Sequence, residues 1–197
     1  MVYAAVLGTI CAALITGAGA FTADRRTANA KAEEVRSILD VLGVPLEEKA
    51  TSRELVELFD SHVQIEGATG DRVVLYKYVD PGNGTVIATA VPFRGMGLQG
   101  PIAGVLALEP DMKTIHGITF HEQEETPGLG GEIASTWFRE QFKGKIIESS
   151  TGEVGIRIVR GGGASGPHEV DAITGATMTS RKVEGMLNEV LGRLPRE

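Results

Sequence analysis

The chain has 197 residues, of which 19 are basic and 26 are acidic, and its formal net charge is −7. This length fits one domain or two small ones, and an apolar fraction of 42% with one cysteine excludes disordered, collagen-like and disulfide-stapled proteins. The acidic balance also argues against a nucleic-acid partner. Neutralising phosphates needs clustered basic side chains, and no basic run here is denser than Arg25 and Arg26.

The start of the chain is an apolar stretch without charged side chains, at residues 2–21. A helix of this length spans about 30 Å, the thickness of the hydrocarbon core of a bilayer. The stretch therefore predicts a transmembrane anchor over residues 1–22. A cleaved signal peptide is the competing interpretation, because Ala18 and Ala20 fit a small-x-small cleavage pattern, but no basic region precedes the stretch. The single cysteine, Cys11, lies inside it.

The residues that flank the anchor bear on its orientation and its neighbours. Arg25, Arg26 and Lys31 follow it, whereas only the amino terminus precedes it, so the positive-inside rule slightly favours a cytoplasmic position for the rest of the chain. Three glycines lie within the anchor, at positions 8, 17 and 19. Because small residues allow membrane helices to approach closely, we expect the anchor to pack against partner membrane subunits.

A juxtamembrane helical segment is predicted over residues 23–60. Apolar side chains recur at helical spacing from residue 28 to residue 42, and Gly43 followed by Pro45 supplies a stop. Thr51 and Glu54 then fit a capping box, which predicts a second, short helix through Phe59.

The rest of the chain, residues 61–197, has the pattern of a mixed domain. Four β-branched and aromatic runs, at residues 72–79, 85–91, 102–109 and 114–121, are separated by short turn sequences, which predicts antiparallel neighbours. A short helix at 135–142, a strand at 154–159 and a closing helix follow. The closing helix carries a core-facing stripe of Val183, Met186, Leu187, Val190, Leu191 and Leu194. We predict an α+β fold, an antiparallel-rich sheet with flanking helices, preceded by one N-terminal transmembrane helix.

A hydroxyl-rich turn, DAITGATMTS at residues 171–180, lies where a strand gives way to the last helix. Gly175 permits a sharp turn and a close backbone approach, and the amides at the start of a helix attract an anion such as a phosphate. Ordinary helix capping by a Ser or Thr side chain explains the same pattern. The turn alone leaves both interpretations open.

The same turn resembles the D-x-x-[ST]-G-A-[TS] flavinylation motif of the FMN-binding domain family, with Asp171, Thr174, Gly175, Ala176 and Thr177 at the motif positions. The resemblance implies that the phosphate of FMN is esterified to the hydroxyl of Thr177. It also implies that a separate flavin transferase makes this bond from FAD and engages Asp171 through its metal. Residues 61–197 would then form an FMN-binding domain.

A second stretch, at residues 106–133, resembles the C-subunit family of Na+-translocating NADH:quinone oxidoreductases. In that family its ETPGLGGE loop, here residues 125–132, lies beside the flavin. The resemblance implies flavin contacts from Glu125, Thr126, Pro127, Gly128, Leu129 and Gly130, together with Asp171, Thr174, Gly175, Ala176 and Thr179. Without the family, the loop is equally explained as a connection between a strand and a helix. The chain departs from the family by a shorter segment around residues 47–72 and by Gln99, where the family often has an aromatic residue.

The resemblance implies an electron-transfer subunit with one covalent FMN in a membrane complex that couples NADH oxidation by a quinone to Na+ export. The flavin carries the redox chemistry, so no side chain is expected to be catalytic. The implied partners are the other membrane, flavin and iron-sulfur subunits and the flavin transferase. The implied location is the cell inner membrane, with a single pass and the flavin domain outside, opposite to the charge pattern.

Two other functions stay open. The G subunit of the Rnf ferredoxin:NAD+ oxidoreductase shares the flavinylation motif, and a non-redox membrane-anchored binding module would use the same turn only to cap a helix around a small anion. A metal site is not expected, because His116 and His121, five residues apart on a predicted strand, would face opposite sides. The chain also lacks a G-x-G-x-x-G motif between a strand and a helix, so no nicotinamide site is expected.

Overall fold

The computed structural model describes residues 2–47, 49–67, 73–148, 152 and 154–195. It is built on a five-stranded antiparallel sheet in which each strand pairs with the strand before it, in the order β1-β2-β3-β4-β5. The strands are β1 Val63–Glu66, β2 Leu75–Val79, β3 Val86–Met96, β4 Pro101–Leu108 and β5 Ile115–Gln123. The predicted antiparallel neighbours and α+β class are confirmed.

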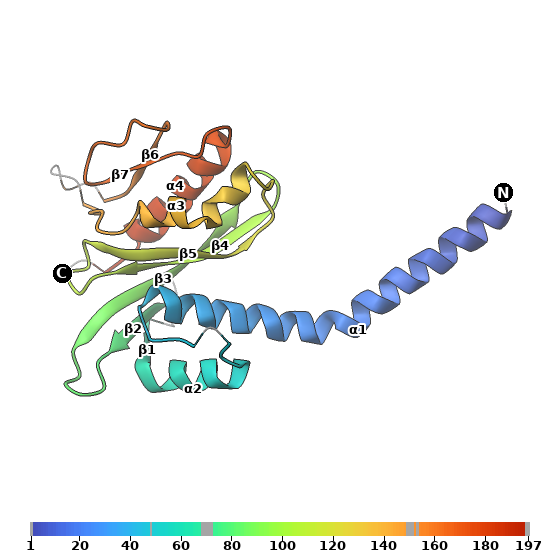
Figure 1. Cartoon of the computed structure of the whole chain (residues 1–197), viewed down its shortest axis with the longest axis horizontal. Coiled ribbons are helices and arrows are strands. Elements are labelled where there is room, and N and C mark those ends of the chain that lie inside the picture. The colour runs from blue at the N-terminus through green and yellow to red at the C-terminus, as the bar shows by residue number, and fades with distance from the viewer. Residues whose placement is uncertain (1, 48, 68–72, 149–151, 153, 196–197) are drawn as a thin grey trace.

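Helices cover both faces of this sheet (Figure 1). One face is covered by the end of α1 (Val2–Val41) and by α2 (Ser52–His62). The other face is covered by the 3-10 turn η1 (Gly130–Ala134), α3 (Thr136–Glu140) and α4 (Thr177–Gly192), with a parallel pair of short strands, β6 (Arg157–Val159) and β7 (Glu169–Asp171), above them.

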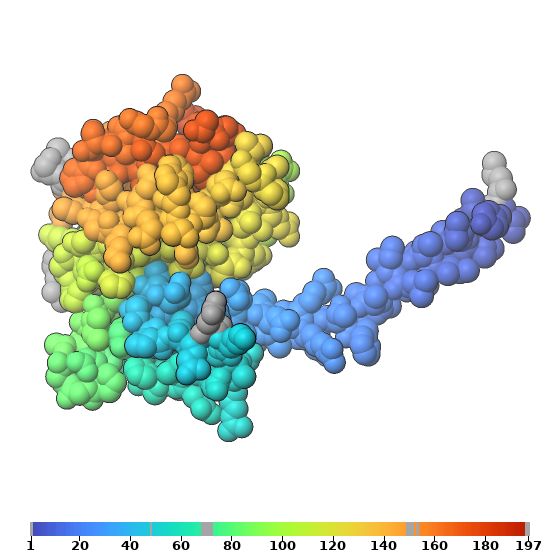
Figure 2. All heavy atoms as spheres, viewed as in Figure 1, coloured from blue at the N-terminus to red at the C-terminus, as the bar shows by residue number. Residues whose placement is uncertain are grey.

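The helix α1 is a single element of 40 residues, which contains both the apolar stretch at residues 2–21 and most of the helical pattern predicted from residue 28 to residue 42. The chain has no glycine or proline between Ala20 and Gly43 to interrupt it, and it leaves the helix at Gly43, whose φ is +75°. Its N-terminal part projects free of the body, as Figure 2 shows, and contains a window that is apolar and long enough to cross a membrane.

Each face of the sheet contributes to its own core, because side chains alternate along β3 and β4. Toward α3 and α4 the sheet presents large side chains, among them Val91, Phe93, Leu106 and Leu108. Toward α1 and α2 it presents small ones, Ala88, Ala90, Val105 and Ala107, which allow the helices to lie close. Leu39 and Leu42 of the α1 end are fully buried there, and burial of each stabilises the packing by about 2 kcal/mol.

The helix α2 begins as the sequence predicts. The backbone amide of Thr51 donates to the Glu54 carboxylate at 2.6 Å, and the amide of Glu54 donates back to the Thr51 hydroxyl at 3.4 Å. This reciprocal capping box satisfies two amides that the first turn leaves without helical partners. The Glu54 pKa lies below its ordinary value because the amide and the hydroxyl of Thr51 both donate hydrogen bonds to its carboxylate.

Several element bounds differ from the sequence prediction. β1 and β7 were not predicted, because strands of 4 and 3 residues show no readable alternation. β3 continues through Pro92 to Met96, which is possible because β2 pairs with β3 only up to Ala90, so the edge on which Pro92 lacks an amide is unpaired. The predicted helix at 135–142 is present as α3, Thr136–Glu140, and the 3-10 turn η1 comes just before it. The helix α4 begins at Thr177, several residues before the predicted stripe.

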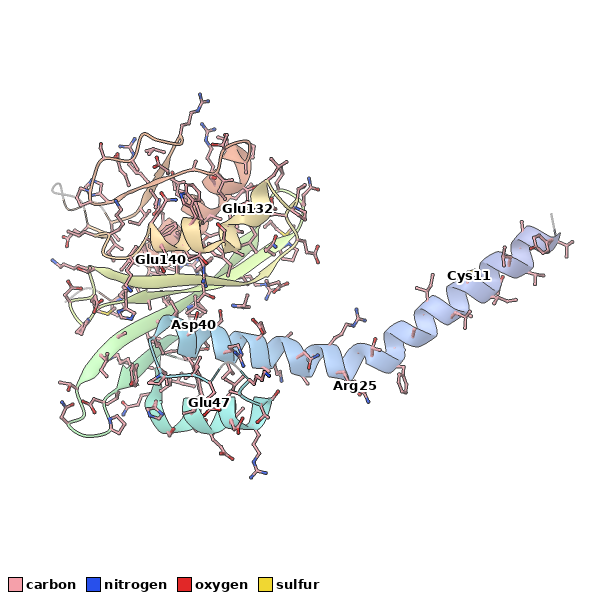
Figure 3. All side chains as sticks on the ribbon, viewed as in Figure 1. Cys11, Arg25, Asp40, Glu47, Glu132 and Glu140 are labelled. Carbon is pink, nitrogen blue, oxygen red and sulfur yellow. The ribbon has the colours of Figure 1, made fainter. Side chains whose placement is uncertain are left out.

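The end of α1 runs antiparallel to β5, which decides where the ends of the strands lie. Going backward along α1, Val41 packs near Gly117, and the hydroxyls of Ser37 and Thr119 form a buried hydrogen bond. The end of β5 therefore points toward the projecting part of α1, and Figure 1 shows α1 leaving the body on that side. In Figure 3, Asp40 lies where α1 meets the sheet, whereas Arg25 and Cys11 lie on the projecting part.

Candidate functional site

The candidate site lies at the end of the sheet where β3 ends, β4 begins and β5 ends, and its centre is the buried carboxylate of Glu125. One oxygen of this carboxylate, Oε1, accepts hydrogen bonds from the backbone amides of Leu98 at 2.7 Å and Gln99 at 3.0 Å. The other, Oε2, accepts from the hydroxyl of Thr179 at 2.6 Å. One side chain thus joins the turn between β3 and β4, the segment after β5 and the first turn of α4.

The electrostatics of Glu125 keep it charged at neutral pH. The residue is only 5% exposed, and burial, the largest single effect, raises its pKa. The hydrogen bonds from Thr179 and from the backbone amides of residues 98–100 stabilise the anion and together hold the pKa below its ordinary value of 4.5. The site therefore contains a fixed negative charge that is hydrogen-bonded on both oxygens.

Two glycines make room for this carboxylate. A Cβ at position 130 would stand 2.5 Å from Glu125 Oε2 and 2.6 Å from Thr179 Oγ1, inside the contact distance of both oxygens. A Cβ at position 97 would collide with Glu125 Oε1. Both glycines are therefore required by close approach to the same carboxylate, and any larger side chain must displace it.

The predicted loop after β5 folds against the predicted turn before α4. Within the loop, the carbonyl of Thr126 accepts hydrogen bonds from the amides of Leu129 at 3.1 Å and Gly131 at 3.0 Å. Leu129 then reaches across to the turn, where its Cδ2 lies 3.0 Å from the place a Cβ at position 175 would occupy. Gly175 has a φ of +81°, so this position needs glycine for its backbone as well as for space. The structure thus brings the two sequence motifs into contact.

The start of α4 is not capped by a side chain. The N-cap residue is Ala176, and no side chain accepts a hydrogen bond at the cap of this helix in the part of the chain that the structure describes. Ser180 is turned inward, where its hydroxyl donates to the Ala176 carbonyl at 3.0 Å and accepts from the Ile173 amide at 3.3 Å. The ordinary capping interpretation of this turn therefore does not describe the structure, and amides of the first turn remain available to an anion.

The two remaining hydroxyls of the turn lie at the surface. Thr177 is half-buried as the first residue of α4, and Thr174 is exposed. Among the described residues, neither hydroxyl forms a hydrogen bond of the kind that holds Thr179 and Ser180. Of the four hydroxyls in the motif, two are therefore committed to internal contacts, and Thr177 and Thr174 are left to react or to bind.

Asp171 shapes the glycine-rich loop next to the turn. One oxygen of its carboxylate accepts hydrogen bonds from the amides of Gly163 and Ala164, both at 2.9 Å. Its own amide donates to the side chain of Gln141 at 2.9 Å, which links β7 to the segment after α3. Asp171 thus has a structural role in this chain, whatever it does toward another protein.

Exposed apolar side chains are carried by the elements that form the candidate site. They are Met96 (64% exposed), Leu98 (55%), Leu129 (44%) and Met178 (52%), carried by the end of β3, the following turn, the loop after β5 and α4. A flavin has an anionic phosphate and a largely apolar ring. The residues present fit both parts, because open helix amides and a free hydroxyl lie beside apolar surface.

Two histidines of β5, His116 and His121, were considered as metal ligands. His116 forms an ion-pair contact with Glu109 at 2.8 Å, and among the described residues no three His, Cys, Asp or Glu side chains are grouped for a metal. The expectation that His116 and His121 face opposite sides was wrong. Irregular register in β5 at both positions interrupts the two-residue period. As a result both side chains lie on the α1 side of the sheet: His116 lies against Gly43, and the carboxylates of Glu33 and Glu34 on α1 act on the pKa of His121.

Part of the site could not be found from the sequence. The amides of Leu98 and Gln99 act through the backbone, which carries no residue signature, and the only hint was the glycines on either side of them. Two surface clefts in the described part of the chain, of about 440 and 420 Å3, lie along α2 and between α1 and β5. Neither is lined by a predicted site residue.

Comparison with known families matches residues 97–192 to the FMN-binding domain, a span that includes every residue of the candidate site except Met96 at its rim. The C subunit of the Na(+)-translocating NADH-quinone reductase of Pasteurella multocida is 39% identical over 110 residues, which cover 56% of this chain and 42% of that protein. The C subunit of Neisseria meningitidis serogroup B is 41% identical over 113 residues, 57% of this chain and 43% of that protein. These matches span less than half the length of those relatives.

Other relatives are similar over most of the chain. The C subunit of Vibrio vulnificus is 28% identical over an alignment of 226 residues, which covers 94% of this chain and 87% of that protein. The crystal structure of Shewanella oneidensis NqrC superposes with a TM-score of 0.70 at 26% identity, covering 83% of this chain and 94% of that one. The crystal structure of the Parabacteroides distasonis C subunit gives 0.69 at 28% identity, with 85% and 92% covered. The predicted resemblance to the C-subunit family is confirmed.

Proposed function

We propose that this chain, which is similar to the C subunits of Na+-translocating NADH-quinone reductases and contains an FMN-binding domain, is a membrane-anchored electron-transfer subunit with one FMN esterified to Thr177. The observation that carries the proposal is the start of α4, where an uncapped helix presents the Thr177 hydroxyl beside Gly175 and Leu129. When bound, the flavin supplies the redox chemistry, and the chain holds it in place and tunes it.

The residues around Thr177 divide into two groups by their burial. Thr126, Pro127, Gly128 and Leu129 are exposed, as are Thr174 and Gly175, so they are available to contact a flavin directly. Ala176 and Gly130 are buried beside them, and Glu125 and Thr179 are buried and bonded to each other. We propose that the exposed residues contact the flavin directly and that the buried residues hold the exposed ones in position.

A covalent bond at Thr177 would be made by an enzyme that delivers the flavin, because forming a phosphate ester of a threonine hydroxyl needs an activated phosphate donor. We propose a flavin transferase that uses FAD as donor and approaches the turn from the exposed side of Thr174 and Gly175. The carboxylate of Asp171 would be its recognition point, in addition to its contacts with the glycine-rich loop.

The proposed setting is a multi-subunit NADH:quinone reductase that couples electron transfer to Na+ export. The named relatives are subunits of such a reductase, and the chain would exchange electrons with the membrane, flavin and iron-sulfur subunits of the same complex. We propose residues 1–22 as the anchor, 23–60 as the juxtamembrane segment and 61–197 as the FMN-binding domain. The isolated chain would be an electron carrier, with no catalytic side chain.

We also propose a single-pass location in the cell inner membrane with the flavin domain on the external side. The direction of α1 against β5 supports a short path from the site to the membrane, since the candidate site lies on the side from which α1 projects. A cysteine introduced at exposed Lys143, in a chain with Cys11→Ser, tests the orientation. A membrane-impermeant maleimide should label this cysteine in intact spheroplasts, from which the outer membrane has been removed. Labelling only after lysis would contradict the external location.

The test of the attachment site is flavin fluorescence of the denatured chain in a gel, after expression with a flavin transferase. Thr177→Ala should abolish the fluorescence, because the acceptor oxygen is gone. Thr174→Ala is the matched control, since it removes the other free hydroxyl of the turn and should leave the fluorescence unchanged. Fluorescence that survives Thr177→Ala, or that disappears only with Thr174→Ala, would contradict the proposal.

A further inference from the structure

Glu125 is unusual in this fold because it is the one ionisable side chain among the described residues that is buried, at 5% exposed. Taking a carboxylate out of water costs several kcal/mol even after local relaxation, and hydrogen bonds to the charge offset that cost. Here three donors from the turn after β3 and from α4 do so, at 2.6 to 3.0 Å. An apolar contact would hold the loops together without this desolvation cost, so packing alone does not explain why a charged side chain is buried here.

The position of the carboxylate connects it to the attachment hydroxyl. Thr179, which donates to Glu125, is two residues after Thr177 in the first turn of α4. The hydrogen bond therefore fixes the turn that carries Thr177. The same carboxylate fixes the backbone of Leu98, and it belongs to the loop that carries Leu129, so one group holds the segments that carry these two exposed apolar side chains.

We propose that Glu125 is a positioning residue for the flavin and that its fixed negative charge lowers the reduction potential of a flavin bound on Thr177. The first part follows from its three hydrogen bonds, and the second from electrostatics, since reduction adds negative charge to the ring and a nearby anion opposes it. This inference rests on the proposed function, because it assigns a role in setting the properties of the flavin that the proposed function places there.

Shape and charge can be separated by substitution. Glu125→Gln keeps the size of the side chain and one oxygen that accepts from the amides of Leu98 and Gln99, but it removes the charge. Thr179→Val keeps the shape of the threonine but removes its hydroxyl, and Thr179→Ser restores the hydroxyl. Glu124→Gln removes the same charge from the neighbouring residue, which is exposed, and serves as the matched control.

The experiment uses the full chain in mild detergent after expression with a flavin transferase. Covalent flavin per chain is measured by intact mass, the potential by a dye-coupled redox titration, and folding by the melting temperature. We expect Glu125→Gln to carry flavin with a potential more positive than that of the wild type, while Glu124→Gln matches the wild type. Thr179→Val should lose flavin several-fold, and Thr179→Ser should recover it.

Two results would overturn the inference. Equal potentials in Glu125→Gln and Glu124→Gln would remove the role of the charge, and wild-type flavin content with a wild-type melting temperature in Thr179→Val would remove the role of the hydrogen bond. Failure of the proposed function looks different, since the wild type itself would then take up no flavin. In that case the melting temperatures of Thr179→Val and Thr179→Ser report only whether the hydrogen bond to Glu125 stabilises the fold.

Discussion

Gly130→Ala should destabilise the candidate site more than its small change in volume suggests. The added methyl group would stand 2.5 Å from Glu125 Oε2 and 2.6 Å from Thr179 Oγ1, so the hydrogen bond between them has to break. A hydrogen bond to a charged group contributes about 1.5–3 kcal/mol, and a methyl group forced into a packed region adds strain. We therefore expect a loss of about 2–4 kcal/mol in the free energy of unfolding.

The assay is thermal unfolding of the full chain in mild detergent, followed by circular dichroism. For a chain of this size 1 kcal/mol corresponds to about 2–4 °C, so the melting temperature should fall by about 5–15 °C. Gly185→Ala is the matched control, because a Cβ there meets nothing within 4 Å and alanine favours the helix by about 0.5–1 kcal/mol. A Gly130→Ala chain that melts at or above the wild-type temperature would refute the steric argument.

Three further predictions follow from single contacts. Thr51→Ala removes the capping box of α2 and should cost about 1 kcal/mol, measured by the same melts, and an unchanged melting temperature would contradict it. The pKa of Glu125 is below 4.5 in the folded chain, so the stabilisation from its charge is complete above about pH 4.5 and is lost as the pH falls through the pKa of the folded state. Glu125→Gln should therefore make the free energy of unfolding less dependent on pH in acid, and an equally steep dependence would contradict this prediction. Asp171→Asn keeps an oxygen for the amides of Gly163 and Ala164, so it should fold normally yet lose covalent flavin, whereas full flavin content would show that the transferase does not need the charge.

Much of the architecture could be predicted from local pattern. The period of apolar residues predicted the antiparallel sheet and the closing helix, and the Thr51 and Glu54 pair predicted the start of α2, because these signals depend on neighbours in the chain. β1 and β7 were missed because they are too short to show a period. The prediction that His116 and His121 face opposite sides was wrong because the register of β5 is irregular at both residues.

The sequence predicted which segments form the candidate site, but it did not predict the contacts between their side chains. The turn with Gly175 and Thr177 and the loop with Leu129 were both identified, and the structure places them in contact. The bond between Glu125 and Thr179 joins residues 54 positions apart, and no local period or spacing reports a contact of that kind. The capping interpretation of the turn was a fair expectation from residue types, but Thr179 and Ser180 are turned inward and leave the helix start uncapped.

The most direct test of the account is the intact mass of the full chain, purified from cells that express a flavin transferase, followed by peptide mapping. We expect a mass increase equal to one FMN less one water, located on the peptide that contains Thr177, and no increase without the transferase. An unmodified mass, with a transferase shown to be active on another substrate, would contradict the account and leave the turn before α4 without a flavin.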